Sequence, residues 1–329
     1  MVTPKVSAFL ITYNQERYIA QAIESVLMQR TSFPIELVIG EDCSTDRTRE
    51  IVCDYQARYP DIIRAILPDK NQGPFKNVET GLAACRGQYI ASLEGDDYWT
   101  DPEKLQLQAD FLDAHQECSI SFHTACMINE DGLFPPTVVP QEARHLKEML
   151  TVADLVETNF IPTCSALWRR ALFDGLPEWV SEIGMSDWPI NILMAKRGHI
   201  GLVNRCMGVY RIHDGGIWST RTVQSRLESW VKAHEYIDRE LDYRYHRPIT
   251  IAKFKRLYIH ALNCISSSDV DARRYVWRTL RTGPPHVCTR QKIALALRLH
   301  APPLLSLCSG IKRALYNPHR NRRGFEPAD

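Results

Sequence analysis

The chain has 329 residues, 44% of them hydrophobic, and its 40 basic and 39 acidic residues nearly cancel. This length and apolar content allow one large core or two unequal ones. The balanced charge gives no overall field that would attract a polyanion, so we expect no nucleic-acid partner.

The cysteine pattern and the N-terminus bear on cellular location. The ten cysteines are scattered and include no Cys-x-x-Cys pair, which argues against a zinc site and against a disulfide scaffold. An apolar run begins at Val6 without the basic region and cleavage site of a signal peptide. No apolar run approaches the roughly 20 residues that span a bilayer. We therefore expect a cytoplasmic protein, soluble or peripheral on the cytoplasmic face of the membrane.

Strand and helix patterns alternate through the first hundred residues. The predicted elements are a strand over 6–13, a helix over 18–27, a strand over 35–39, a helix over 51–59, a strand over 62–67, a helix over 78–85 and a strand over 89–93. Asn14 is predicted to cap the first of these helices. Alternation of this kind indicates a mainly parallel sheet with helices on both faces.

Polar residues follow three of the predicted strands, at Tyr13-Asn14, Asp42 and Asp96-Asp97. Ligands of such sheets bind outside the carboxyl ends of the strands. Because the carboxyl ends of parallel strands share one edge, we expect these residues to meet there.

The acidic turn Glu94-Gly95-Asp96-Asp97 places neighbouring carboxylates at the mouth of the sheet. A divalent cation with oxygen ligands would neutralise them, and Mg²⁺ typically takes one or two carboxylates together with substrate phosphates. The alternative is a solvated acidic turn, closed by Asp101-Pro102.

No strand is followed by Gly-x-Gly-x-x-Gly, and Gly-x-x-x-x-Gly-Lys-Ser/Thr is absent from the chain. A dinucleotide dehydrogenase and a P-loop phosphatase are therefore disfavoured. Carboxylates plus a metal, in place of a glycine cradle, suit a nucleotide-sugar site.

Several segments in order resemble the family 2 glycosyltransferases of GT-A fold, a group of inverting sugar transferases. The matching segments are 10–14 (Leu-Ile-Thr-Tyr-Asn), 41–48 (Glu-Asp-Cys-Ser-Thr-Asp-Arg-Thr), 71–73 with Asn77 and Gly81, 87–99, 186–189 (Ser-Asp-Trp-Pro) and 210–213 (Tyr-Arg-Ile-His). The resemblance covers about residues 5–220. It implies a GT-A (Rossmann-like) α/β fold and an enzyme of the bacterial surface-glycan type. From about Trp218 the strand–helix alternation ends, and the pattern predicts a smaller α-helical C-terminal region.

The resemblance implies a donor pocket at the first two strand ends. Asp42 would contact the base or ribose, with Thr12, Tyr13 and Asn14 flooring the same pocket, and Arg211 is a candidate contact of the diphosphate. The alternative for Asp42 is a capping or Asx-turn role at the next helix.

For the metal, the resemblance implies Mn²⁺ or Mg²⁺ at the acidic turn. Asp97 would be the direct ligand, Asp96 a ribose or second metal contact, and His213 a residue near the metal or the diphosphate. The alternative for His213 is a purely structural role. Glu94 stands where many relatives carry Asp and is a secondary candidate. Such a cation would absorb charge on the departing nucleoside diphosphate.

Asp187 matches the catalytic base of the family. Direct inversion needs a carboxylate that takes the proton of the incoming hydroxyl, and general-base assistance is typically worth about 10²–10⁴ in rate. The alternative is an acidic residue in the first turn of a helix, favoured by the helix dipole.

We expect a catalytic domain over 1–217, with a nucleotide-sugar half over about 1–100 and an acceptor half over about 101–217, and a helical region over 218–329. Residues 290–323 hold eight Lys/Arg and no Asp or Glu, with leucines and isoleucines between them. Such a segment can contact an anionic membrane, which would fit a lipid-linked acceptor. The alternative is a helix docked on its own domain with a solvated basic tail.

The sequence thus predicts an inverting, metal-dependent glycosyltransferase that uses a nucleoside-diphosphate sugar, with UDP as the favoured nucleotide. The acceptor would be a hydroxyl of a glycan, a lipid-linked precursor or a small molecule, and a homodimer is left open. The alternatives are a nucleotidyltransferase and a non-catalytic nucleotide-sugar-binding assembly protein.

Overall fold

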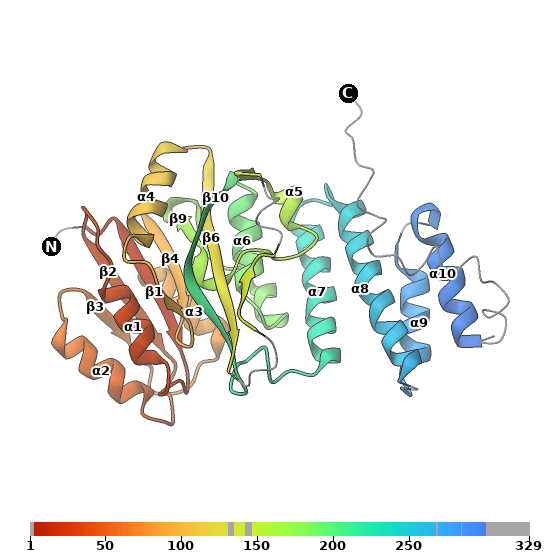
Figure 1. The fold of residues 1–329 in the computed structure, drawn as a ribbon, viewed down its shortest axis with the longest axis horizontal. Coiled ribbons are helices and arrows are strands. Elements are labelled where there is room, and N and C mark those ends of the chain that lie inside the picture. Colours follow the sequence, from red (N-terminus) through yellow and green to blue (C-terminus); the bar gives the residue numbers. More distant parts are fainter. Residues whose placement is uncertain (1–2, 131–134, 142–146, 268, 284, 301–329) are drawn as a thin grey trace. The chain divides into compact units, whose positions relative to one another are not determined.

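The computed structural model divides the chain into two compact units, Met1–Tyr243 and Arg244–Asp329. The residues that the structure describes are 3–130, 135–141, 147–267, 269–283 and 285–300. Figure 1 shows the order of the elements along the chain.

The larger unit is built on a ten-stranded mixed sheet. Its strands are β1 Val6–Thr12, β2 Ile35–Glu41, β3 Ile63–Ile66, β4 Tyr89–Glu94, β5 Tyr98–Trp99, β6 Cys118–Asn129, β7 Thr137–Val139, β8 Met149–Leu150, β9 Leu167–Arg169 and β10 His199–Ile212. Its α-helices are α1 Ile19–Leu27, α2 Thr48–Arg58, α3 Pro74–Ala84, α4 Lys104–Ala114, α5 Val152–Leu155, α6 Asp187–Ala195 and α7 Val223–Glu240. Short 3₁₀ helices span η2 Thr163–Ser165, η3 Arg170–Leu172 and η4 Glu178–Glu182.

The main strand order is β3-β2-β1-β4-β9-β6-β10-β5. The four strands from β3 to β4 are mutually parallel, as the βα alternation of the sequence predicted. The next strand, β9, is antiparallel to both β4 and β6, whereas β6 and β10 are parallel to each other. The predicted GT-A-like, mainly parallel α/β fold is confirmed, with antiparallel strands added in the second half.

Helices cover both faces of the sheet. Successive side chains of β1 point to opposite faces, so both sets are buried. Val6, Ala8 and Leu10 lie in a core cluster that also contains apolar residues of α1, α2 and α4. On the other face, Phe9 packs so closely on α3 that a Cβ at Gly81 would lie 2.0 Å from its ring. The near-continuous apolar sequence of β1 follows from this two-sided burial.

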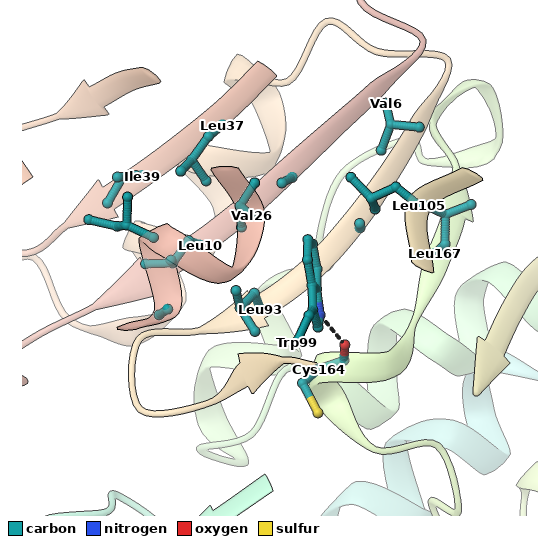
Figure 2. Close-up of a cluster of buried hydrophobic side chains, with 14 of the residues drawn as sticks. Val6, Leu10, Val26, Leu37, Ile39, Leu93, Trp99, Leu105, Cys164 and Leu167 are labelled. Atoms are coloured by element: carbon teal, nitrogen blue, oxygen red, sulfur yellow. Dashed lines mark hydrogen bonds between the residues drawn. The ribbon is translucent and has the colours of Figure 1, made fainter. Parts of the chain in front are cut away.

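Trp99 joins the core to the segment that follows the acidic turn. Its indole is 1% exposed and packs among core side chains, and its Nε1–H donates a 2.7 Å hydrogen bond to the carbonyl oxygen of Cys164 (Figure 2). The turn that carries Asp96 and Asp97 is therefore anchored on its C-terminal side by a large buried ring.

The larger unit extends to Tyr243, beyond residue 217 at which the sequence analysis ended the catalytic domain. The added element is α7, whose N-cap Thr222 accepts a 3.1 Å hydrogen bond from the Ser225 backbone N–H. This helix packs on α6 through Trp188 and Trp230, whose ring centroids lie 5.7 Å apart. Its apolar face is buried in the larger unit, which is why it belongs there despite its helical pattern.

In the described part of the smaller unit, three helices form the fold: α8 His246–Ser266, α9 Ala272–Arg281 and α10 Pro285–His300. Its interior includes Phe254, Leu257, Tyr275 and Leu295. The predicted helical C-terminal region is confirmed over these residues, while residues 301–323 of the predicted basic amphipathic segment lie outside the described residues. No helix in the described ranges has the length and apolar character to cross a membrane.

Lys104 in α4 is an unusual buried amine. The residue is 0% exposed, and its Nζ has no hydrogen-bond partner among the described residues. Nζ lies 3.8 Å from the centroid of the Trp99 ring. Burial lowers the pKa of this ammonium to about 7, so desolvation outweighs the attraction of the ring.

We expect Lys104→Met to stabilise the protein at neutral pH. The unfolded chain binds a proton at Lys104 below about pH 10.4, whereas the native state does so only below about pH 7, so this difference favours unfolding across that window. The gain should be about 2–5 kcal/mol at pH 7, since one pK unit corresponds to about 1.4 kcal/mol, and it should shrink as the pH rises toward 10.4. Urea unfolding at several pH values measures it.

The exposed residue Lys147 supplies the control, because Lys147→Met should change stability little and without this pH dependence. Equal stability of wild type and Lys104→Met at pH 7 would contradict the buried neutral amine.

Candidate active site

The carboxyl ends of three parallel strands meet at one edge of the sheet. In the pairing register Thr12 of β1 lies opposite Glu41 of β2, and Ile11 lies opposite Glu94 of β4. Tyr13, Asp42 and the acidic turn follow directly at this edge, as expected from the sequence. The side chain of Tyr13 is 40% exposed there.

Asp42 is engaged by a neighbouring loop. Its two carboxylate oxygens accept 2.7 and 2.8 Å hydrogen bonds from the backbone N–H groups of Gln72 and Gly73, and its carbonyl oxygen accepts one from the side chain of Asn71. The residue is only 3% exposed. This carboxylate therefore organises the loop beside the predicted donor pocket, a role that the sequence analysis did not foresee.

Asn14 does not cap a helix, and this prediction was wrong. The helix α1 begins five residues later, at Ile19, and Asn14 itself has φ of 52°, in the left-handed region that Asn tolerates. Its Oδ1 accepts a 2.8 Å hydrogen bond from Thr45 N–H, and its own N–H donates to Ser44 Oγ at 2.9 Å. Asn14 thus joins the ends of β1 and β2 and shapes the predicted donor pocket.

Asp97 faces into the protein. It is 0% exposed, its Oδ1 accepts a 2.9 Å hydrogen bond from the backbone N–H of Arg211, and its Oδ2 is buried without a hydrogen-bond partner among the described residues. Burial, then the charges of Asp96 and Glu94, hold the pKa of this carboxyl well above its usual range. No arginine side chain is bonded to it.

Asp96 points toward β10. Its Oδ2 lies 3.0 Å from His213 Nε2, and its side chain keeps 17% of its surface exposed. The backbone N–H of Gly215 donates to His213 Nδ1 at 3.2 Å, so the proton of the neutral ring lies on Nε2 and is donated to Asp96. This hydrogen bond is the main cause that raises the pKa of His213.

Arg211 is held from several sides. Its guanidinium donates to the carbonyl oxygen of Asp96 and, at 2.5 Å, to Gln21 Oε1, and it lies 4.6 Å from the ring centroid of Tyr98. Its side chain is 8% exposed and also approaches Glu130 at 3.6 Å. These contacts hold the acidic turn against β10. Arg211 therefore supports the turn, and it stays a candidate contact of the diphosphate.

Asp187 opens α6 and lies close to the acidic turn. Its Oδ2 accepts a 2.6 Å hydrogen bond from Asn159 Nδ2. A cavity of about 20 Å³ is lined by both Asp187 and Glu94, together with Thr163. This volume holds about one water molecule. The predicted base and the acidic turn, 90 residues apart in sequence, are thus brought to one place.

Glu94 and Asp187 are compensated differently. Burial, then the charges of Asp96 and Asp187, raise the pKa of Glu94 well above its usual range, and no side-chain hydrogen bond stabilises its anion within the described residues. Burial also raises the pKa of Asp187, but the Trp188 N–H and the side chains of Asn159 and Thr163 oppose that shift. Hydrogen-bond donors therefore favour the anion at Asp187, whereas none is seen to do so at Glu94 in the described part of the chain.

Two residues at this site were missed as contributors by the sequence analysis. Asn159 holds Asp187, but it lies in a stretch without helical or strand periodicity, which gives no signal. Burial raises the pKa of the Tyr210 phenol, and the charges of four carboxylates raise it further. These carboxylates are Glu94, Asp97, Asp187 and Asp96. Its place beside Arg211 in a matching segment was the only available signal.

The donor set fits a divalent cation between Asp96 and His213. Carboxylate oxygen and imidazole nitrogen are both ligands of divalent cations. The present 3.0 Å contact between Oδ2 and Nε2 is a hydrogen bond, which a bound cation would replace with loss of the Nε2 proton. No group of three or more His, Cys, Asp or Glu side chains poised to hold a metal occurs in the described ranges. An ion here would thus rely on other ligands, such as phosphate oxygens or water, as Mg²⁺ commonly does.

We expect Asp42→Ala to destabilise the protein by about 1–3 kcal/mol, because it removes the acceptor of the Gln72 N–H and leaves the Gly73 N–H with Asn71 Oδ1 alone. Urea unfolding measures the change. The stability of Asp42→Asn, which keeps one acceptor oxygen, should lie between the stabilities of wild type and Asp42→Ala. A fully stable Asp42→Ala variant that has lost nucleotide binding would favour a direct ligand contact over the loop-anchoring role.

The sequence has relatives among known proteins. The family described as "Glycosyl transferase family 2" matches residues 7–176, about half of the chain. Rv1520 of Mycobacterium tuberculosis, described as an uncharacterized protein, is 41% identical over 221 residues. That alignment covers 66% of this chain and 61% of Rv1520, so the chain spans less than two thirds of this relative.

Two solved structures share the fold. One is Staphylococcus aureus TarS 1–349 in complex with UDP-GlcNAc, with a TM-score of 0.64, 18% identity, and coverage of 90% of this chain and 87% of TarS. The other is the mannosyltransferase PcManGT of Pyrobaculum calidifontis in complex with GDP-Man and Mn²⁺, with a TM-score of 0.55, 16% identity, and coverage of 95% and 84%. Taken with the family match and the geometry of the strand ends, these findings establish that the chain belongs to glycosyl transferase family 2.

Proposed function

We propose that this protein is an inverting, metal-dependent glycosyltransferase. It moves a sugar from a nucleoside-diphosphate sugar, with UDP as the favoured nucleotide, to a hydroxyl of an acceptor. The observation that carries this proposal is that Asp187 and Glu94 line one cavity. Glu94 lies two residues before Asp96, which contacts His213. A candidate base and a candidate metal site therefore share one strand edge.

The donor would bind at the ends of β1 and β2, over the pocket formed by Thr12, Tyr13 and Asn14, with the Asp42-anchored loop as its wall. TarS binds UDP-GlcNAc and PcManGT binds GDP-Man with Mn²⁺, according to the descriptions of their complexes. Both share this fold, which supports a nucleotide-sugar donor and a divalent cation here. The choice between Mn²⁺ and Mg²⁺ is part of the test below.

We assign the cation to Asp96 and His213, where the sequence analysis favoured Asp97 as the direct ligand. Asp96 is partly exposed and its Oδ2 lies 3.0 Å from an imidazole nitrogen. Asp97 is fully buried and already accepts the Arg211 N–H. Asp97 then supports the site from behind by fixing the end of β10. When bound, the cation would neutralise charge that develops on the diphosphate leaving group.

Asp187 would act as the general base. Hydrogen bonds from Asn159 Nδ2 and the Trp188 N–H favour its anion. As the acceptor oxygen forms its bond to the anomeric carbon and the bond to the diphosphate breaks, the hydroxyl proton passes to Asp187. Attack from the side opposite the diphosphate inverts the anomeric configuration.

The acceptor, the location and the oligomeric state remain at the level of the sequence-based proposals. The acceptor is a hydroxyl of a glycan, of a lipid-linked precursor or of a small molecule, and the protein is cytoplasmic. A nucleotidyltransferase is less well supported, because Thr12 to Gln15 after β1 contains no basic residue to hold a triphosphate. A non-catalytic nucleotide-sugar binder is distinguished by turnover.

Calorimetric titration of UDP with and without Mn²⁺ tests the metal site. Asp96→Asn and His213→Ala should each lose at least about tenfold of the Mn²⁺-dependent affinity, since metal-supporting residues typically contribute about 10–100-fold. Asp97→Asn should keep most of it, because an amide oxygen can still accept the Arg211 N–H. Repeating the titration with Mg²⁺ ranks the two ions.

The exposed His199 provides a matched control, and His199→Ala should bind UDP and Mn²⁺ as wild type does. If Asp97→Asn abolishes the Mn²⁺ effect while Asp96→Asn keeps it, the assignment of the direct ligand returns to Asp97.

Release of UDP from a panel of UDP-sugars, in the presence of Mn²⁺, tests catalysis. Asp187→Asn should keep UDP affinity and lose about 10²–10⁴ in turnover, the usual worth of a general base. Asn159→Ala should fall between wild type and Asp187→Asn, because it removes one hydrogen bond that orients the carboxylate.

Asp110→Asn, at an exposed position of α4, is the matched control and should turn over normally. If Asp187→Asn turns over as fast as wild type, Asp187 is not the base. If wild type binds UDP but shows no turnover, the non-catalytic alternative is favoured.

A further inference from the structure

The near-zero net charge of the chain hides a strong asymmetry between its two units. Residues 244–329 contain 17 Lys/Arg and 4 Asp/Glu, whereas residues 1–243 contain 23 Lys/Arg and 35 Asp/Glu. The formal charges are therefore about +13 and −12. Such a concentration of positive charge in a small helical unit attracts anionic partners.

Helix α9 presents part of this charge on one face. Arg273, Arg274, Trp277 and Arg281 are all exposed, and positions four residues apart lie on the same side of a helix. The opposite face is buried in the unit through Ala272, Tyr275, Val276 and Thr279. We call the exposed set, Arg273, Arg274, Trp277 and Arg281, the α9 face.

Solvation of a charged helix does not explain why the Trp277 ring is exposed. Its side chain is 53% exposed in the midst of three exposed arginines, although large aromatic rings are normally covered. Tryptophan and arginine together favour the headgroup layer of a membrane, where the ring is sheltered and the guanidinium groups meet phosphates. Val270, which precedes the helix, is 96% exposed as well.

We propose that the α9 face docks the protein on an anionic lipid bilayer. Negative headgroups would pair with Arg273, Arg274 and Arg281, while the Trp277 ring enters the interface between headgroups and acyl chains. Among residues 244–300 the only carboxylates are Asp269 and Asp271, both before the helix, so the contact centres on Trp277 and extends toward Arg281. This relocates the predicted membrane contact from residues 290–323 to an element that the structure describes.

Two other occupants fit the observations less well. Residues 301–325 of this chain contain five Lys/Arg and no Asp or Glu, so their charge does not complement the α9 face. The acidic larger unit of a second copy complements the arginines, but it shelters the indole only where an exposed apolar residue such as Tyr59 or Ile217 lies opposite, whereas a bilayer needs no such match. A bilayer satisfies both the charge and the ring.

Vesicle co-sedimentation of the full chain tests the proposal independently of catalysis. We expect binding to vesicles made of phosphatidylglycerol and phosphatidylcholine in equal parts, and none to phosphatidylcholine alone. Arg273→Gln combined with Arg281→Gln should weaken the partition coefficient by at least about tenfold, given about fivefold per basic residue near such a surface. Trp277→Ala should weaken it as well, and its effect should persist at high salt, where charge pairing is screened.

The matched control is Arg30→Gln combined with Lys147→Gln, which removes the same charge from exposed positions of the larger unit and should bind as wild type does. Circular dichroism of each variant checks that it is folded. The proposal is overturned if wild type does not bind, if the control loses as much binding as the α9 variants, or if Trp277→Ala binds normally. Full displacement by soluble polyphosphate, or salt-sensitive self-association without vesicle binding, overturns it in favour of a polyanion or a second copy.

Discussion

The site depends on the burial of several carboxylates at one strand exit, where each must be compensated. Mutual repulsion raises the pKa of any carboxyl in such a group, so its charge is kept only where donors face it. Three of the carboxylates here have different donors: the Arg211 N–H for Asp97, the His213 ring for Asp96 and the Asn159 amide for Asp187. The pKa of Glu94 is raised by burial and by the charges of Asp96 and Asp187. This division leaves one anion suited to proton transfer and one oxygen–nitrogen pair suited to a cation.

The end of β10 provides much of that compensation, although it is more than a hundred residues from the acidic turn. Pairing of Gly208 with Trp99 and of Val209 with Tyr98 brings the two segments together. Arg211 and His213 then reach the turn from the next positions of β10 and its exit. Because these contacts cross the sheet, the proposed cation site requires both halves of the larger unit to be folded, which short-range sequence patterns do not encode.

Much of the fold could be predicted from the sequence, because it rests on local periodicity. The βα alternation correctly indicated the parallel strands β1 to β4 and the strand edge at which polar residues gather. The roles of single side chains were harder to predict. Asp42 and Asn14 have the composition of ligand or cap residues, but they are used to bind loops that lie 30 residues away. Asn159 orients Asp187 through a contact that no spacing rule reveals.

Asp96 and Asp97 illustrate this limit most clearly. Asp96 lies in the turn and Asp97 follows it just before β5. The Asp96 side chain contacts His213, whereas Asp97 is fully buried and accepts the Arg211 N–H. Which of them faces the solvent-accessible side depends on where β5 pairs with β10, because the burial of Trp99 fixes the orientation of the turn. Which of the two acids keeps an exposed surface therefore depends on long-range strand pairing, and the order of the two residues in the sequence does not determine it.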